Sequence, residues 1–392
     1  MIKGSFFNNI LFPQDYKKDH FKALDGLRGM AVLLVVLGHT SLDKMFIAPG
    51  LNFEYTGKMG VFLFFVLSAY LLDRQIIIGY VNKKANYKFW LNYSMRRFLR
   101  IYPLFFIALL VFFAASKFSP SSPITTPRDI INNLFLIKGD GIFWSIVVEF
   151  KYYFISPFIM AFCNYVLKWD FKKVSVFLGL ITAACIYYVN TSNLSEISFV
   201  RYLPIFLTGT FLSIYEVVYL KERESDVKKN KALEIAGLAA ALIILLTIPH
   251  LFNTVFGQHI KGWYFHDPIF YFPYALLWAI VLLSSKYGKF EFLKKIFEFK
   301  ILRFLGVVSF STYLFHIPVM KVIELSKLHI NKNVQFYVFF LVTSGLVFLS
   351  YLLIERPLQQ IKIDYESTEK GISFKKKKKT KVFEEAKPAG VL

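Results

Sequence analysis

Cysteine and acidic residues are scarce in this chain, and several familiar catalytic motifs are missing from it. The 392 residues include two cysteines, Cys163 and Cys185, and both fall within long apolar stretches, which argues against a disulfide framework. The sequence has no glycine-rich phosphate loop, no histidine spacing typical of a metal site and no nucleophile elbow. Nothing in it therefore indicates a P-loop nucleotide hydrolase, a zinc enzyme or a serine hydrolase.

Apolar residues dominate the composition. Hydrophobic residues make up 56% of the chain, aromatic residues 19%, and the mean hydropathy is +0.48, whereas soluble domains are about 45–50% apolar. Ten stretches are long and apolar enough to span a bilayer: residues 23–43, 59–80, 98–116, 143–166, 173–190, 200–219, 232–250, 269–285, 304–325 and 334–354. The sequence therefore predicts an all-α, polytopic membrane bundle of about ten transmembrane helices.

The charge is strongly basic, with 47 lysine and arginine residues against 26 acidic residues and a net charge of +21. Most of the positive side chains fall in segments on the same side of the predicted spans as the N-terminus, so the positive-inside rule places both termini in the cytoplasm. The charge is then explained by topology, and no nucleic-acid partner is expected. The tail run Lys375–Lys379 is interpreted as a segment that contacts anionic membrane lipid.

These patterns divide the chain into three regions. Residues 1–22 form a cytoplasmic N-terminal segment, residues 23–357 a transmembrane domain, and residues 358–392 a basic tail that is predicted to be disordered.

Ionisable side chains inside the first span are the most informative feature of the sequence. Charged groups within a membrane are expensive, and a functional site is the usual reason for them. Arg28 and His39 are eleven residues apart, which places them on one helix face about 16 Å apart along the axis. Asp25 precedes Arg28 by three residues and is expected to pair with it.

Further polar groups lie at or within later spans. Arg96, Arg97 and Arg100 precede Tyr102 at the cytoplasmic mouth of the third span, where they act either as a positive-inside anchor or as ligands of a phosphorylated cosubstrate. Glu149 lies about two turns inside the fourth span and is expected to be functional.

Two further residues, one aromatic and one titratable, each fit two interpretations. Trp144 fits either an interfacial aromatic belt or a binding site. His316, near mid-depth in the ninth span, fits either a hydrogen bond between helices or a catalytic role.

Six short motifs in this order resemble the acyltransferase-3 family of integral membrane acyltransferases that modify cell-surface polysaccharides. The matching segments are Leu24–Gly29 with Arg28 and His39 in the spacing R-x10-H, Phe64–Ser68, Arg97–Pro103, Trp144–Glu149, Tyr313–His316 and Glu355–Pro357. The resemblance covers residues 20–357 and implies a bacterial plasma-membrane enzyme. It also implies acyl-CoA as donor and a glycan or lipid-linked sugar as acceptor.

The resemblance implies that His39 and Arg28 lie in the site and that Arg97 and Arg100 act as a pair, and no metal ion is expected. His39, Arg28, Asp25 and Glu149 are expected to be catalytic, with His39 as general base or transient acyl carrier and Glu149 orienting it. The expected ligands of the acyl-CoA, most simply acetyl-CoA, are Arg96, Arg97, Arg100 and Tyr102. The expected contacts of the acceptor are Trp144, Ser145 and His316.

Two other functions remain open at this point. Intramembrane arginine, histidine and glutamate are also typical of a transporter or flippase for a glycolipid or an anion. An acyltransferase that acts on a non-glycan acceptor is the other alternative. If the acceptor is a glycan, the polysaccharide biosynthesis machinery is an expected partner.

Overall fold

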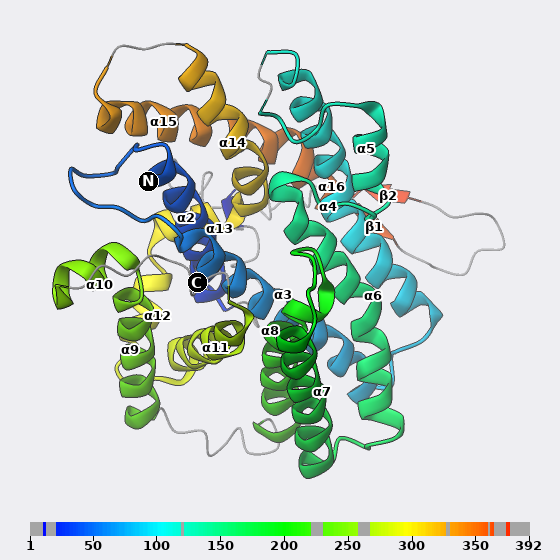
Figure 1. Ribbon diagram of the computed structural model, residues 1–392. Helices are drawn as coiled ribbons and strands as arrows, with labels where there is room; N and C mark the ends of the chain where they lie inside the picture. The colour runs from blue at the N-terminus through cyan, green and yellow to red at the C-terminus, as the bar shows by residue number, and fades with distance from the viewer. Residues whose placement is uncertain are drawn as a thin grey trace, which may run out of the picture.

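Helices form nearly all the regular structure of the chain in a computed structural model (Figure 1). The structure describes residues 11–12, 21–118, 121–220, 230–257, 267–326, 330–359, 361–363 and 374–376. Most of the predicted N-terminal segment 1–22 and of the basic tail 358–392, with part of the run Lys375–Lys379, lies outside the described residues.

Eight continuous helical units among the described residues are long and apolar enough to cross a membrane. They are α2 (Ala23–Leu42), α3 (Thr56–Val81), α4 (Tyr87–Ala115), η2 with α6 (Gly141–Phe143 and Trp144–Tyr165), α7 (Phe171–Thr191), α8 with the π-helix η3 (Phe199–Ile214 and Tyr215–Leu220), η6 with α11 (Pro268–Phe270 and Tyr271–Tyr287), and α15 with the π-helix η7 and α16 (Lys332–Ser350, Tyr351–Glu355 and Arg356–Gln359).

Two further spans are broken. Helices α9 (Lys231–Leu246) and α10 (Pro249–Phe256) meet at 91°, and α13 (Lys300–Val307) and α14 (Ser309–Leu325) meet at 80°. Counted as one span each, they bring the described total to ten, so the predicted all-α membrane bundle is confirmed. The remaining elements are the short helices α5 (Pro127–Leu134) and α12 (Phe292–Phe297) and the antiparallel pair β1 (Ile361–Ile363) and β2 (Phe374–Lys376).

Helix α4 begins earlier than the hydropathy of the third span predicts. The side chain of Asn86 caps it by accepting a hydrogen bond from the Phe89 backbone N–H. The turns that follow carry polar and basic side chains, which conceal a helix from a search for apolar runs. Arg97 and Arg100 therefore lie within the helix and not in front of it.

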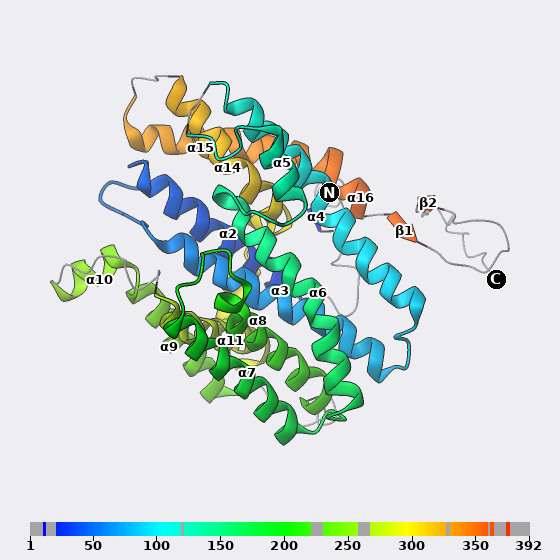
Figure 2. The same ribbon diagram turned by 45° about the vertical axis from the view of Figure 1, so that its right-hand side comes forward.

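Helices α2 and α3 form the centre of the bundle. In their most apolar windows 67% of the residues are buried, compared with 28% in α7 and α15. Both ribbon views show α14 and α15 on one side of this pair and α7, α8, α9 and α11 on the other (Figures 1 and 2). The ionisable groups on α2, Asp25, Arg28 and His39, therefore lie within the bundle, where each is partly buried.

Glycines on α2 and α13 allow the two helices to cross with their backbones in contact. A Cβ atom added to Gly29 would lie 1.8 Å from the Leu302 carbonyl oxygen in α13, and one added to Gly26 would lie 1.7 Å from that of Phe297, the last residue of α12. Conversely, a Cβ added to Gly306 of α13 would lie 1.7 Å from the Asp25 carbonyl oxygen of α2. This crossing fixes the rotation of α2, and with it the direction of Arg28.

Replacing Gly29 with alanine is expected to destabilise the protein by about 1–3 kcal/mol or more, because a packed contact cannot accept an added methyl group. Thermal unfolding of the detergent-purified protein measures the effect. Gly179→Ala in α7 is the matched control, since nothing lies within 4 Å of its added Cβ and alanine favours a helix. An unchanged unfolding temperature for Gly29→Ala would show that the crossing is looser than described.

Candidate active site

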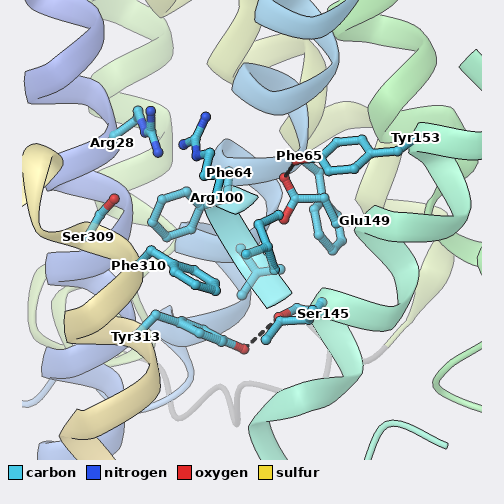
Figure 3. A pocket seen from close by; sticks show the side chains of 13 residues that line it. Arg28, Phe64, Phe65, Arg100, Ser145, Glu149, Tyr153, Ser309, Phe310 and Tyr313 are labelled. Atoms are coloured by element: carbon cyan, nitrogen blue, oxygen red, sulfur yellow. Dashed lines mark hydrogen bonds between the residues drawn. The ribbon is translucent and has the colours of Figure 1, made fainter. Parts of the chain in front are cut away.

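A cavity that is open on one side lies between α2, α3, α4, α6 and α14, with about 560 Å³ of space including the part open to solvent (Figure 3). Polar side chains from four of these helices face it. The lining residues are Arg28, Val61, Phe64, Phe65, Arg100, Ile101, Ser145, Ile146, Glu149, Tyr153, Ser309, Phe310 and Tyr313. The cavity thus brings together Arg28, Arg100, Ser145 and Glu149, four of the predicted site residues.

One end of the cavity carries two guanidinium groups. Figure 3 shows Arg28 from α2 and Arg100 from α4 reaching toward each other at the end opposite Ser145 and Tyr313. Among the described residues neither side chain makes a hydrogen bond or an ion pair. Two like charges that converge form a good site for an anion, and phosphate oxygens match the geometry of guanidinium groups.

The other basic candidates on α4 lie elsewhere. The Arg97 guanidinium donates to Gln75 Oε1 at 3.0 Å and lies 5.6 Å from the centre of the Tyr93 ring. Arg96 is exposed. The Tyr102 hydroxyl donates to the Leu134 carbonyl oxygen at 3.2 Å, which ties α4 to α5. Arg97 and Arg100, which the family resemblance presents as a pair, therefore differ in what they contact.

Asp25 lies on α2 one turn before Arg28, at the crossing with α13. Its carboxylate forms an ion pair with Arg303, whose Nη2 lies 3.6 Å from Asp25 Oδ2. This contact joins the same two helices as the glycine crossing. The predicted pairing of Asp25 with Arg28 remains a prediction, and the contact with Arg303 was missed because α13 is distant in sequence.

Glu149 lies on the cavity wall and is held by two hydroxyl groups. Ser68 Oγ and Tyr153 OH each donate to its Oε1 at 2.5 Å. The expectation that Glu149 orients His39 remains a prediction: the hydrogen bonds of Glu149 join it to α3 and to its own helix, and the ring partner of His39 is a second histidine.

Ser145 and Tyr313 close the end of the cavity away from the arginines. Ser145 Oγ donates to Tyr313 OH at 2.7 Å, and Tyr313 OH donates to the Ile142 carbonyl oxygen at 2.7 Å. The neighbouring Trp144 packs against Tyr202 with ring centres 5.0 Å apart. Trp144 is thus part of the aromatic packing between α6 and α8, and Ser145 faces the cavity.

His39 and His316 meet beyond this end of the cavity. His39 Nδ1 lies 2.8 Å from His316 Nε2, although 277 positions separate them in sequence. The His316 ring centre is 6.0 Å from that of Tyr313, three residues earlier on α14. The structure therefore places an imidazole pair directly behind a cavity whose far end is cationic.

The acyltransferase domain family matches residues 21–355, a range that includes every residue lining the cavity and both histidines. The chain belongs to the acyltransferase-3 family. With eight to ten apolar helical spans among its described residues, this acyltransferase-3 member is a multi-pass membrane protein.

Several curated proteins resemble this acyltransferase-3 chain. The peptidoglycan O-acetyltransferase OatA of Listeria monocytogenes is 27% identical over 88% of this chain and 57% of its own length. The O-acetyltransferase OatA of Staphylococcus aureus is 24% identical over 88% of this chain and 58% of its own length. A putative O-acetyltransferase of the same species is 26% identical over 89% of the chain and 59% of its own length.

The chain spans less than two thirds of the length of these relatives. No solved structure matches it.

Sequence reasoning missed several residues that the acyltransferase-3 cavity contains. Ser68 ends the matching segment Phe64–Ser68 but was given no role, yet its hydroxyl donates to Glu149. Tyr153, Ser309 and Tyr313 were not among the candidates, although all three line the cavity. The available signal was the unusual density of hydroxyl groups in Ser309–Tyr313 at the start of an otherwise apolar span.

No group of three or more histidine, cysteine, aspartate or glutamate side chains within the described ranges is arranged to hold a metal ion. The His39–His316 contact supplies two nitrogens that hydrogen bond to each other.

Proposed function

We propose that the chain transfers an acyl group, most simply acetyl, from cytoplasmic acyl-CoA to a hydroxyl group of a cell-envelope glycan or lipid-linked sugar. The observation that carries this proposal is the cavity with Arg28 and Arg100 at one end and the His39–His316 pair behind the other. Membership of the acyltransferase-3 family and the names of the O-acetyltransferase relatives support it.

The two arginines are assigned to the phosphate groups of the acyl-CoA. The positive-inside pattern of the sequence favours a cytoplasmic position for this end of the cavity. Arg28 and Arg100 come from different helices and make no hydrogen bond or ion pair among the described residues, so an incoming diphosphate would relieve their mutual repulsion. With the phosphates held there, the pantetheine arm would extend past Ser309 and Phe310 toward Tyr313.

His39 is assigned as the general base. It removes the proton from an acceptor hydroxyl, whose oxygen attacks the thioester carbonyl carbon. The new ester C–O bond forms as the C–S bond breaks, and the proton passes from His39 to the departing thiolate to give free coenzyme A. Glu149 is assigned to the cavity wall, where it orders Ser68 and Tyr153.

Mass analysis of envelope glycans tests the proposed function. Cells with the intact protein, without it and with His39→Ala are compared. We expect the glycan to be lighter by one acyl unit in both the deletion and the variant, which would also identify the group transferred.

Two results would contradict the proposal. Unchanged acylation with an internal accumulation of lipid-linked glycan would favour a transporter. If the glycan is unchanged and a protein or lipid instead loses an acyl group in the deletion and in the variant, a non-glycan acceptor would be favoured. Release of coenzyme A thiol by the purified protein, dependent on an acceptor, separates transferase from transporter, since a transporter leaves the thioester whole.

A further inference from the structure

The hydrogen bonds of His316 fix which of its ring nitrogens carries a proton. His316 Nδ1 lies 2.7 Å from the Tyr313 carbonyl oxygen and 3.1 Å from that of Thr312. Carbonyl oxygens only accept hydrogen bonds, so Nδ1 must be the donor. In a neutral imidazole the other nitrogen, Nε2, is then an acceptor.

The charged form of His316 does not fit its surroundings. The side chain is fully buried at 0% exposure, and the polar partners that the structure gives it are the two carbonyl oxygens and His39. An imidazolium enclosed in this way without a carboxylate would be costly. His316 is therefore neutral, with a lone pair on Nε2 directed at His39.

The contact between the two rings is edge to edge. The ring centres are 5.0 Å apart, and the planes are inclined by 18°. The distance between the centres nearly equals the 2.8 Å nitrogen separation plus the radii of the two rings, so both nitrogens lie close to the line joining the centres. This geometry suits a hydrogen bond from His39 Nδ1–H to the lone pair of His316 Nε2.

We propose that His316 is a positioning residue that holds His39 in the tautomer with Nδ1 protonated and Nε2 bare. This inference rests on the proposed function and adds the atom at which the acceptor hydroxyl is deprotonated, His39 Nε2. His39 is only partly buried, whereas His316 is completely enclosed, so His39 is the one of the two imidazoles that a substrate can reach.

The arrangement also specifies how the proton moves. When Nε2 of His39 takes the hydroxyl proton, Nδ1–H remains bonded to the neutral His316 and no proton crosses between the rings. His39 then releases the proton from Nε2 to the thiolate. His316 thus plays the part that a carboxylate plays in many catalytic triads, which is to fix the orientation and tautomer of the base.

Two substitutions at His316 separate this role from simple packing. His316→Leu removes the acceptor while keeping an apolar side chain, whereas His316→Gln places a carbonyl oxygen near the former Nε2. We expect His316→Leu to lower kcat by about 10²-fold with little change in the KM for acetyl-CoA, and His316→Gln to restore much of the loss. His250→Leu in α10 is the matched control, and unfolding temperatures identify any variant that fails to fold.

Nitrogen NMR of histidine-labelled protein reads the tautomer directly, with His39→Ala used to assign the signal. The expected result is a protonated Nδ1 and an unprotonated Nε2 on His39 in the unsubstituted protein, lost in His316→Leu and kept in His316→Gln. A protonated Nε2 on His39, or a tautomer unaffected by His316→Leu, would overturn the inference. The NMR result is independent of turnover, so an inactive protein with the expected tautomer would count against the proposed function and not against this pairing.

Discussion

Replacing His39 with alanine is expected to lower kcat for acyl transfer by about 10²- to 10⁴-fold, the range that a general base commonly contributes. His39 lies on the central helix α2, where it contacts His316 and follows the glycine crossing by more than two turns. Since the crossing and the ion pair between Asp25 and Arg303 lie nearer the start of α2, membrane insertion and folding should survive the substitution.

Acceptor-dependent release of coenzyme A thiol, measured on protein purified to equal amounts, gives kcat and KM for this comparison. His250→Ala, outside the cavity, controls for the general effect of losing a histidine. If His39→Ala retained full activity, His39 would not be the base.

A related measurement distinguishes direct transfer from a transient acyl-histidine. Incubation with radiolabelled acetyl-CoA without acceptor should leave no label on the protein if His39 acts only as a base. Label that is retained by the intact protein and absent from His39→Ala would instead assign nucleophilic catalysis to His39.

The sequence predicted the fold well because membrane spans are governed by local composition. Each of the ten apolar stretches corresponds to a described helix or bent helix pair. The start of α4 was misplaced because Tyr87–Arg97 is too polar for a hydropathy criterion, although Asn86 is a recognisable helix cap. The bend within the seventh span falls at the extended residue Ile248 before Pro249, a local signal that hydropathy does not use, whereas the break at Val308 in the ninth span has no proline.

The sequence predicted individual residues of the candidate site but not which of them contact each other. Arg28 and His39 share a helix, so their relation followed from helical geometry. The contact of His39 with His316 spans 277 positions, and the arrangement of α2 against α14 decides it. Likewise Arg97 and Arg100 share a motif, yet their different rotation around α4 turns one toward Gln75 and the other into the cavity.

This difference on α4 leads to a second prediction with a large effect, on the binding of the donor. Arg100→Gln and Arg28→Gln are each expected to raise the KM for acetyl-CoA by about 10- to 100-fold, since a hydrogen bond to a charged group contributes about 1.5–3 kcal/mol. Arg97→Gln should have a much smaller effect because its guanidinium is engaged by Gln75 and Tyr93. Arg96→Gln, at an exposed position, is the neutral control.

The double variant decides whether the two arginines hold the same anion. If one diphosphate bridges them, removing the second arginine should cost less than removing the first, with a coupling of about 0.5–3 kcal/mol between the substitutions. The KM for acetyl-CoA measures this, and dephosphorylated pantetheine thioester, whose KM should hardly respond to either change, provides the substrate control. Additive effects would mean that Arg28 and Arg100 contact separate groups. A large effect of Arg97→Gln on the KM would mean that Arg97 and Arg100, both in the motif Arg97–Pro103, bind the phosphate.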